Sequence, residues 1–145
     1  MPNPASPLEA LEAALYSVLT GSTTLMAMIE AVAPSYVPGT IVRPIVTFGL
    51  SAMPERIEHL GGSACDVFRH RFSAFTEQSA MGSVDKAVGQ AIIAACITLL
   101  HRKKPTLTGY TCIMSIVENP YAETITVYGG QSFAGISLDL VNWVA

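Results

Sequence analysis

The sequence has unusually few charged residues. Only 13% of its 145 residues are Asp, Glu, Lys or Arg, and 50% are hydrophobic, whereas about 25% of residues are charged in a typical globular protein. Because so few charges cannot cover a compact domain, we expect exposed apolar patches, which commonly mark interfaces between chains. A surface built from the many Ser, Thr, Gly and Gln residues is the alternative interpretation. The low charge therefore favours self-association without requiring it.

Positive charge is the scarcest kind. The chain has 8 Lys and Arg against 11 Asp and Glu, which gives a net charge of −3. Proteins that bind nucleic acid carry a basic patch that neutralises phosphates. The one basic cluster, Arg102-Lys103-Lys104, is typical of a solvated helix C-terminus, where cations complement the helix dipole. The composition thus argues against specific nucleic-acid binding.

Long apolar runs are also missing. The longest uncharged stretches, residues 13–29 and 87–100, are interrupted by Gly21-Ser22 or fall short of the roughly 20 residues that span a bilayer. Glu9 and Glu12 occupy the N-terminal region, where a secretory signal would carry basic residues. We therefore expect a soluble chain with no membrane partner.

No spacing of reactive residues indicates catalysis, a cofactor site or a metal site. The nucleophile elbow, the phosphate-binding loop and the dinucleotide fingerprint are all missing, and no His or Cys pair has zinc-ligand spacing. We predict that the protein is not an enzyme. His70, between Phe68 and Phe72, is expected to be a core histidine. The three cysteines, an odd and widely spaced set, are expected to be free thiols: Cys65, Cys96 and Cys112.

The N-terminal segment predicts a helix. Ser6 can cap it, Pro7 suits its first turn, and Glu9 completes a capping box. Leucines and a valine then recur at helical spacing on one face until Gly21. A short second helix is expected within residues 23–32.

Strands are predicted in five later segments. The first, residues 41–51, should lie at an edge or begin after Pro44, which has no backbone donor. Alternation in the second puts Phe68, His70 and Phe72 on one face, with Arg69 and Arg71 on the other. Gly129-Gly130 looks like a hairpin turn, and residues 54–62 look like a loop. The remaining strand segments are 65–75, 106–118, 122–128 and 133–144. The order predicts one α+β domain over residues 1–145, with a mostly antiparallel sheet and two main helices on one face.

The helix predicted over residues 83–101 is apolar on two sides. A helical wheel centres its core face near Val88 and Ala95, which leaves Ile93, Ile97 and Leu100 among polar residues. Such a helix either is buried twice or contacts another chain, and the low charge favours the second interpretation. We therefore take these three residues as candidates for a subunit interface. Arg69 and Arg71 are further candidates for contact with a partner, or else part of a solvated face.

Several segments together resemble a phage family. The helix Leu8 to Leu19, the run Arg43 to Gly49 after its proline, the strand Phe68 to Phe75, and the helix Ala87 to Leu100 followed by Leu107-Thr108-Gly109 are similar to elements of the tail-completion or tail-terminator proteins of long-tailed bacteriophages. The resemblance covers most of residues 8–117. Residues 119–131 are longer and richer in Thr and Tyr than the usual turn in that family.

The resemblance implies a structural role in the virion. Members of this family form a ring, commonly of six subunits, that ends tail-tube growth and joins the tail to the head connector. A protein of this kind would be assembled in the host cytoplasm and would have itself, the tail-tube protein and the head connector as partners. It implies neither catalysis nor a cofactor. A head-side connector and a small ligand-binding or enzymatic domain are the alternative interpretations.

Overall fold

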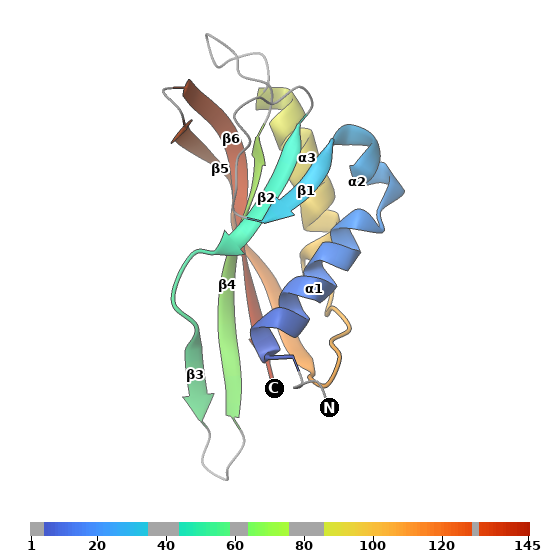
Figure 1. Ribbon diagram of the computed structural model, residues 1–145, viewed down its shortest axis with the longest axis vertical. Coiled ribbons are helices and arrows are strands. Elements are labelled where there is room, and N and C mark those ends of the chain that lie inside the picture. Colours follow the sequence, from blue (N-terminus) through green and yellow to red (C-terminus); the bar gives the residue numbers. More distant parts are fainter. Residues whose placement is uncertain (1–4, 35–43, 59–63, 76–85, 129–130) are drawn as a thin grey trace.

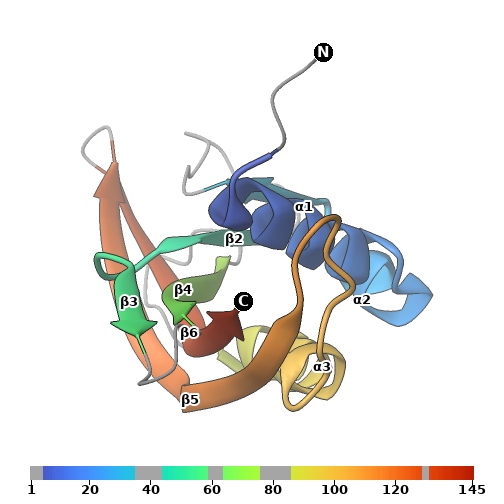
Figure 2. The ribbon, with the colours of Figure 1, turned by 90° about the horizontal axis from the view of Figure 1, so that it is seen from below.

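The computed structural model describes residues 5–34, 44–58, 64–75, 86–128 and 131–145. In this part of the chain three helices cover one face of a curved, mixed sheet (Figures 1 and 2). The strand order in the sheet is β1 (Ala31–Pro34), β2 (Ile45–Leu50), β4 (Ala64–Phe75), β6 (Gln131–Val144) and β5 (Cys112–Tyr128). A further strand, β3 (Glu55–Glu58), pairs with residues 64–67 of β4. All pairs are antiparallel except β1 with β2. The expected α+β class, with a mostly antiparallel sheet and helices on one face, is confirmed.

Helix α1 (Pro7–Thr20) begins and ends where the sequence predicts. The Ser6 hydroxyl accepts a hydrogen bond from the Glu9 amide at 3.2 Å, and the Glu9 carboxylate accepts one from the Ser6 amide at 3.3 Å. These two bonds form the predicted capping box. Gly21 ends the helix, and its N–H donates to the Ser17 carbonyl at 2.9 Å. The buried face of α1 packs Leu11, Leu15 and Leu19 into the core.

The second helix is shorter than predicted. Helix α2 covers only Thr23–Met28, and Ala31–Pro34 forms β1, which pairs in parallel with β2 (Ile45–Leu50). The Glu30 amide donates to the Pro44 carbonyl at 2.7 Å and leads the chain into this pairing. Pairing with a distant strand thus overrides local helical pattern. Strand β2 begins directly after Pro44, as expected, and residues 41–43 of the predicted strand lie outside the described residues.

The segment predicted to be a loop contains a strand. β3 (Glu55–Glu58) pairs with the first part of β4 (Ala64–Phe75) and extends the sheet at one end of the molecule (Figure 1). The pairing includes an ion pair between Arg56 and Asp66 at 3.7 Å. Three of its four residues are charged, a composition that strand propensity alone does not favour.

The last two strands form a long hairpin. β5 (Cys112–Tyr128) is one strand where two were predicted, and it pairs with β6 (Gln131–Val144) along most of its length. The predicted break falls on a shift of register between Glu118 and Ala122. Residues 106–111 precede the strand and do not belong to it. The expected turn at Gly129-Gly130 lies outside the described residues.

The core lies between the helices and the sheet. Phe68, His70 and Phe72 of β4 face it, as the alternation predicted, and their side chains are buried. Helix α3 (Lys86–Leu100) contacts β4, β5 and β6 on one side and the two N-terminal helices on the other. Residues 83–85 of the predicted helix lie outside the described segments. Across the described segments, no helix is long and apolar enough to cross a membrane.

Candidate interaction surfaces

Helix α3 is buried from two sides by its own chain. Ile93 is 0% exposed and Leu100 is 2% exposed, while Ile97 is half-buried and packs against the core. Val88, which the helical wheel put at the centre of the core face, is 43% exposed. The prediction that Ile93 and Leu100 face solvent is therefore wrong. Of the two interpretations of a helix with two apolar sides, burial twice within the subunit is the correct one.

The wheel failed because nearly every residue of α3 is apolar or small. Alanines at four of its positions give no preference for either side, so the largest side chains decide the orientation. Ile92, Ile93, Cys96 and Leu100 follow the i, i+1, i+4, i+8 spacing of one face, and all are buried. Among the interface candidates on this helix only Ile97 keeps partial exposure, so its contact with a partner stays a prediction.

Arg69 and Arg71 lie on the sheet face that no helix covers, and each is paired across strands. Arg69 Nη1 lies 3.1 Å from Glu118 Oε2, and Arg71 Nε lies 2.9 Å from Asp139 Oδ1. The hydrogen bond and the charge of Asp139 raise the pKa of Arg71. Both arginine side chains remain about half exposed, at 42% and 54%. They are accessible to a partner, but their charges are already balanced within the chain.

His70 connects the sheet to α1 from inside the core. Its Nε2 lies 3.1 Å from Glu12 Oε1, and its side chain is 0% exposed. Burial lowers the pKa of His70, although the hydrogen bond and charge of Glu12 act in the opposite direction. The prediction that His70 is a satisfied core or semi-buried histidine is confirmed for its burial, but Nδ1 has no hydrogen-bond partner among the described residues, so the ring is satisfied at Nε2 alone. Within the described residues, no group of three or more His, Cys, Asp or Glu could hold a metal ion.

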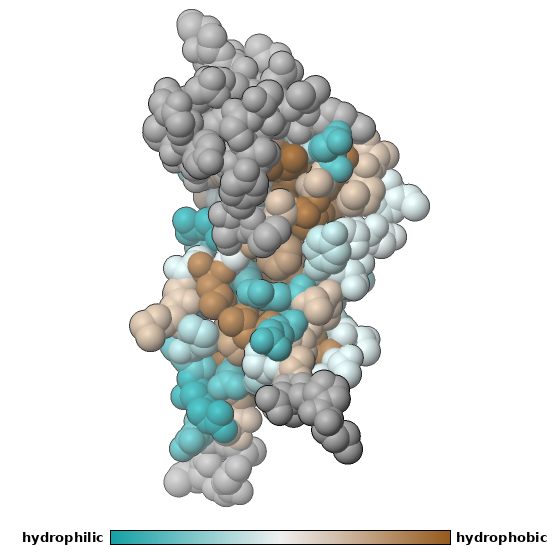
Figure 3. Space-filling view, viewed as in Figure 1, coloured by the Kyte–Doolittle hydropathy of each residue, from teal (hydrophilic) through white to brown (hydrophobic). Residues whose placement is uncertain are grey.

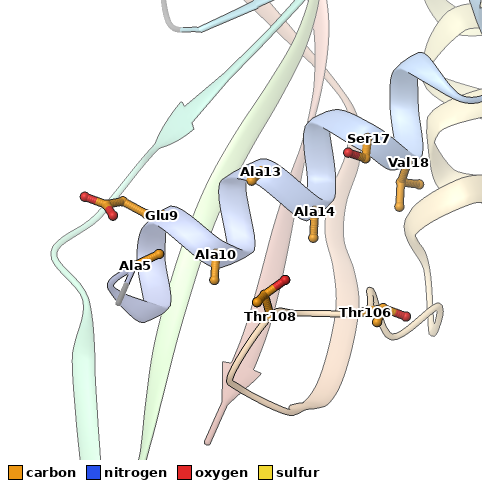
Figure 4. A pocket seen from close by; sticks show the side chains of 9 residues that line it. All are labelled: Ala5, Glu9, Ala10, Ala13, Ala14, Ser17, Val18, Thr106 and Thr108. Carbon is orange, nitrogen blue, oxygen red and sulfur yellow. The ribbon is translucent and has the colours of Figure 1, made fainter. Parts of the chain in front are cut away.

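A pocket of about 510 Å³ lies between α1 and the segment that precedes β5 (Figure 4). Its lining is dominated by alanine methyl groups of α1 and by Thr106 and Thr108. Glu9 supplies the one carboxylate of the lining, which already accepts a hydrogen bond from the Ser6 amide. The pocket therefore offers small apolar surface and the hydroxyls of Ser17, Thr106 and Thr108, and its carboxylate is engaged in capping the helix.

The three cysteines are free, as predicted, and all three are buried. Burial raises the pKa of Cys96 to about 12. It also raises the pKa of Cys112, whose thiol lies 3.5 Å from the Met114 carbonyl. These thiols are thus small apolar core groups and poor nucleophiles at neutral pH.

The outer edge of β5 is covered along its first half, Cys112–Glu118. The Val117 amide donates to His101 Nδ1 at 3.1 Å, and the Arg102 amide donates to the Ser115 carbonyl at 2.8 Å. Arg102 adopts a left-handed φ of 56° to make this turn. The end of α3 therefore satisfies backbone groups of β5 that a neighbouring strand would otherwise bind. Sequence analysis missed this role of His101, because nothing in the sequence places it beside Val117.

The second half of β5, residues 122–128, pairs with β6 from Ala122 opposite Ser137 to Tyr128 opposite Gln131. A shift of register separates the halves, and Asn119 and Tyr121 there have positive φ of 46° and 63°. This end of the hairpin lies opposite the β3–β4 end along the long axis of the molecule (Figure 1). On the face seen in Figure 3, hydrophilic residues gather over β3, and hydrophobic residues lie nearer the middle. The β3–β4 end of the molecule is thus hydrophilic on this face.

No known protein family matches the sequence, and no curated protein is significantly similar to it. The fold, in contrast, has a solved counterpart. It is a chain from the virion of a native gene transfer agent particle, with a TM-score of 0.70 and 20% sequence identity. The two chains share one fold. The alignment covers 97% of this chain and 98% of the virion chain, so the likeness is not confined to a common fragment.

Proposed function

We propose that this protein is a structural subunit of a phage-type virion and has no enzymatic activity. The observation that carries the proposal is the fold likeness to a gene transfer agent virion chain over nearly the full length of both chains. Two independent features support it. The sequence elements of residues 8–117 resemble a phage tail family, and the low charge of 13% suits a chain that buries much of its surface in an assembly.

More specifically, the subunit forms a homo-oligomeric ring, with six copies as the expected number, at the neck of the particle. This ring ends the growth of the tail tube and joins it to the head connector. Its partners are further copies of itself, the tail-tube protein and the connector, and it is assembled in the host cytoplasm before it enters the virion. The elongated subunit supports this role, because its two ends can face different neighbours (Figure 1).

The direct test is a particle-producing strain that lacks this gene, examined by electron microscopy. The expected result is tails of uncontrolled length that are not joined to heads, with normal particles restored by the gene in trans. Normal particles without the gene would contradict the virion role. Tails of normal length beside unjoined heads would instead support a head-side connector and contradict tail termination.

A further inference from the structure

Four strands cross the lower part of the sheet in Figure 1, in the order β3, β4, β6 and β5. Their register forms a row in which each residue lies opposite the next: Glu55, Val67, Trp143 and Met114. Glu55 of β3 and Met114 of β5 therefore lie at opposite ends of this row. This part of the sheet has two lateral sides, one at β3 and one at the start of β5, and the two are different surfaces.

The side at β3 has an excess of negative charge. Glu55, Arg56 and Glu58 are exposed, and Asp66 of β4 lies opposite Arg56. Arg56 Nε lies 3.5 Å from Glu58 Oε1, and Arg56 Nη1 lies 3.7 Å from Asp66 Oδ1. Two carboxylates thus share one guanidinium, and Glu55 makes no ion pair within the described segments. Three carboxylates and one arginine leave an excess of two negative charges.

The side at the start of β5 has an excess of positive charge. Arg102, Lys103 and Lys104 are exposed and make no ion pair with any residue in the described ranges. The Arg102 amide donates to the Ser115 carbonyl at 2.8 Å, which holds this cluster beside β5. Burial raises the pKa of Cys112, and the charge of Lys104 acts in the opposite direction, so Lys104 also lies close to the start of β5.

Each side also exposes two large apolar side chains. On the β3 side, Leu50 and Met53 are 39% and 88% exposed. On the β5 side, Ile113 and Met114 are 45% and 36% exposed. These are four of the seven large hydrophobic residues that are exposed in the described part of the chain. Exposed apolar residues beside charges of one sign are typical of an interface, where the charges select the partner.

We propose that copies of this chain join head to tail, with the side at β3 of one subunit against the side at the start of β5 of the next. This inference rests on the proposed ring. We call the first surface the acidic side (Leu50, Met53, Glu55 and Glu58) and the second the basic side (Arg102, Lys103, Lys104, Ile113 and Met114). Contact between two different surfaces of one subunit closes into a ring when the rotation permits.

A second copy is the partner because the two sides complement each other. One side has an excess of carboxylates, the other has an excess of cations, and both expose apolar side chains. Contact between two copies of the same side would bring like charges together, which opposes a two-fold dimer. Exposed ion pairs contribute little affinity individually. The apolar side chains therefore hold the subunits together, and the charges set their order.

Reversing the charges of one side at a time tests the contact. Glu55→Lys/Glu58→Lys makes the acidic side basic, and Lys103→Glu/Lys104→Glu makes the basic side acidic. All four positions are exposed, so both variants should remain folded by circular dichroism. Each variant alone presents like charges at every contact. In sedimentation experiments, it should raise the concentration needed for assembly at least tenfold.

Mixing the two variants tests the head-to-tail order. The reversed side of one variant then meets the reversed side of the other, and the two unchanged sides also match. The mixture should therefore assemble near the wild-type concentration, with the two variants alternating around a ring of even number, and native mass spectrometry counts the copies of each. A mixture that stays unassembled overturns the proposal.

The matched control is Thr23→Glu/Thr24→Glu, which adds negative charge at exposed positions of α2, far from β3 (Figure 1). It should assemble like the wild type, and its failure would show that net charge alone governs assembly, which overturns the proposal. If the wild type and both reversed variants form the same closed oligomer, the proposed contact is overturned and the ring stands. A wild-type protein that stays monomeric at high concentration and in the presence of tail tubes overturns both.

Discussion

The two halves of β5 share β6 as a partner strand but differ in the groups that the structure places at their outer edge. In the first half, the Val117 amide donates to His101 Nδ1 and the Arg102 amide donates to the Ser115 carbonyl. In the second half, residues 122–128, the described strand pairing is with β6. The comparison shows that the residues after α3 close the edge of the first half within the subunit.

The register shift marks the border between the two halves. Asn119 and Tyr121 have positive φ, and Pro120 between them cannot donate to the ladder. A bulge of this kind bends the strand and increases its twist. The hairpin therefore leaves the helix layer near the position where the cover from α3 ends.

The largest effect is expected from Ile93→Asp, which attacks the helix that provides the cover. Ile93 is 0% exposed, and an unpaired carboxylate there should cost about 4 kcal/mol or more, enough to unfold many domains. Circular dichroism and urea unfolding measure the loss. The matched control Val88→Asp, at a 43% exposed position of the same helix, should change stability by about 0.5 kcal/mol or less. A folded, stable Ile93→Asp would mean that α3 does not dock as described.

His101→Ala should leave the outer edge of β5 without a hydrogen-bond partner at Val117. It removes the acceptor of the Val117 amide, and leaving a partly buried donor unsatisfied costs about 1–3 kcal/mol. Urea unfolding should show this loss, and light scattering should show new association through the exposed edge. His101→Gln, which retains an acceptor, should recover part of the stability. Wild-type stability in His101→Ala would indicate that the cover is incidental.

Acid should lower the stability of the core through His70. The pKa of His70 is lowered by burial from its ordinary value of 6.5, so the unfolded chain binds protons more readily than the folded one. Stability due to His70 is therefore present above about pH 6.5 and is lost as the pH falls toward the lower folded pKa, by at most about 1.4 kcal/mol per pH unit.

The control for this pH effect is His70→Gln, which can still donate to Glu12 but does not titrate. Its unfolding free energy should depend less steeply on pH between 6.5 and 5.5. Where the subunit stays folded, assembly should be insensitive to pH in the same range if its contacts are as apolar as the low charge of 13% suggests. A subunit contact that weakens sharply in this window would point to an interface with a group that titrates there.

The smallest perturbation compares thiols at two neighbouring positions of β5. Cys112 lies buried in the covered half, and its pKa is raised by burial. It should react with a thiol reagent roughly 10²-fold more slowly than a cysteine introduced by Ile113→Cys, at the neighbouring position, which is 45% exposed, measured below the assembling concentration. Cys96, with a pKa of about 12, should be equally slow. Equal rates at positions 112 and 113 would mean that Cys112 is not buried as described.

The sequence predicted the features of the fold that are set by neighbouring residues in the chain. The capping box at Ser6 and Glu9, the start of β2 after Pro44 and the alternation around His70 all follow from neighbouring residues, and the structure confirms them. The segments decided by distant partners were missed. β1 and β3 exist because β2 and β4 lie beside them, and no local pattern encodes that proximity.

The candidate site was predicted only in part for the same reason. Arg69 and Arg71 were placed on the correct sheet face by alternation, but their partners Glu118 and Asp139 come from other strands. The orientation of α3 was wrong because its apolar residues surround the helix and give the wheel no clear phase. The uncharged stretch of residues 124–138 was visible in the sequence. Its role could not be inferred there, because the sequence does not show which residues lie beside it in the fold.

Hydrogen exchange of backbone amides tests the central claim most directly, because it reports on the fold of the subunit and on its contacts in one experiment. In the free subunit, the Val117 amide should be protected by its hydrogen bond to His101 Nδ1. On assembly, amides that enter a subunit contact should gain at least a hundredfold protection, and that of Val117 should change little. Assembly without any gain of protection would contradict the account.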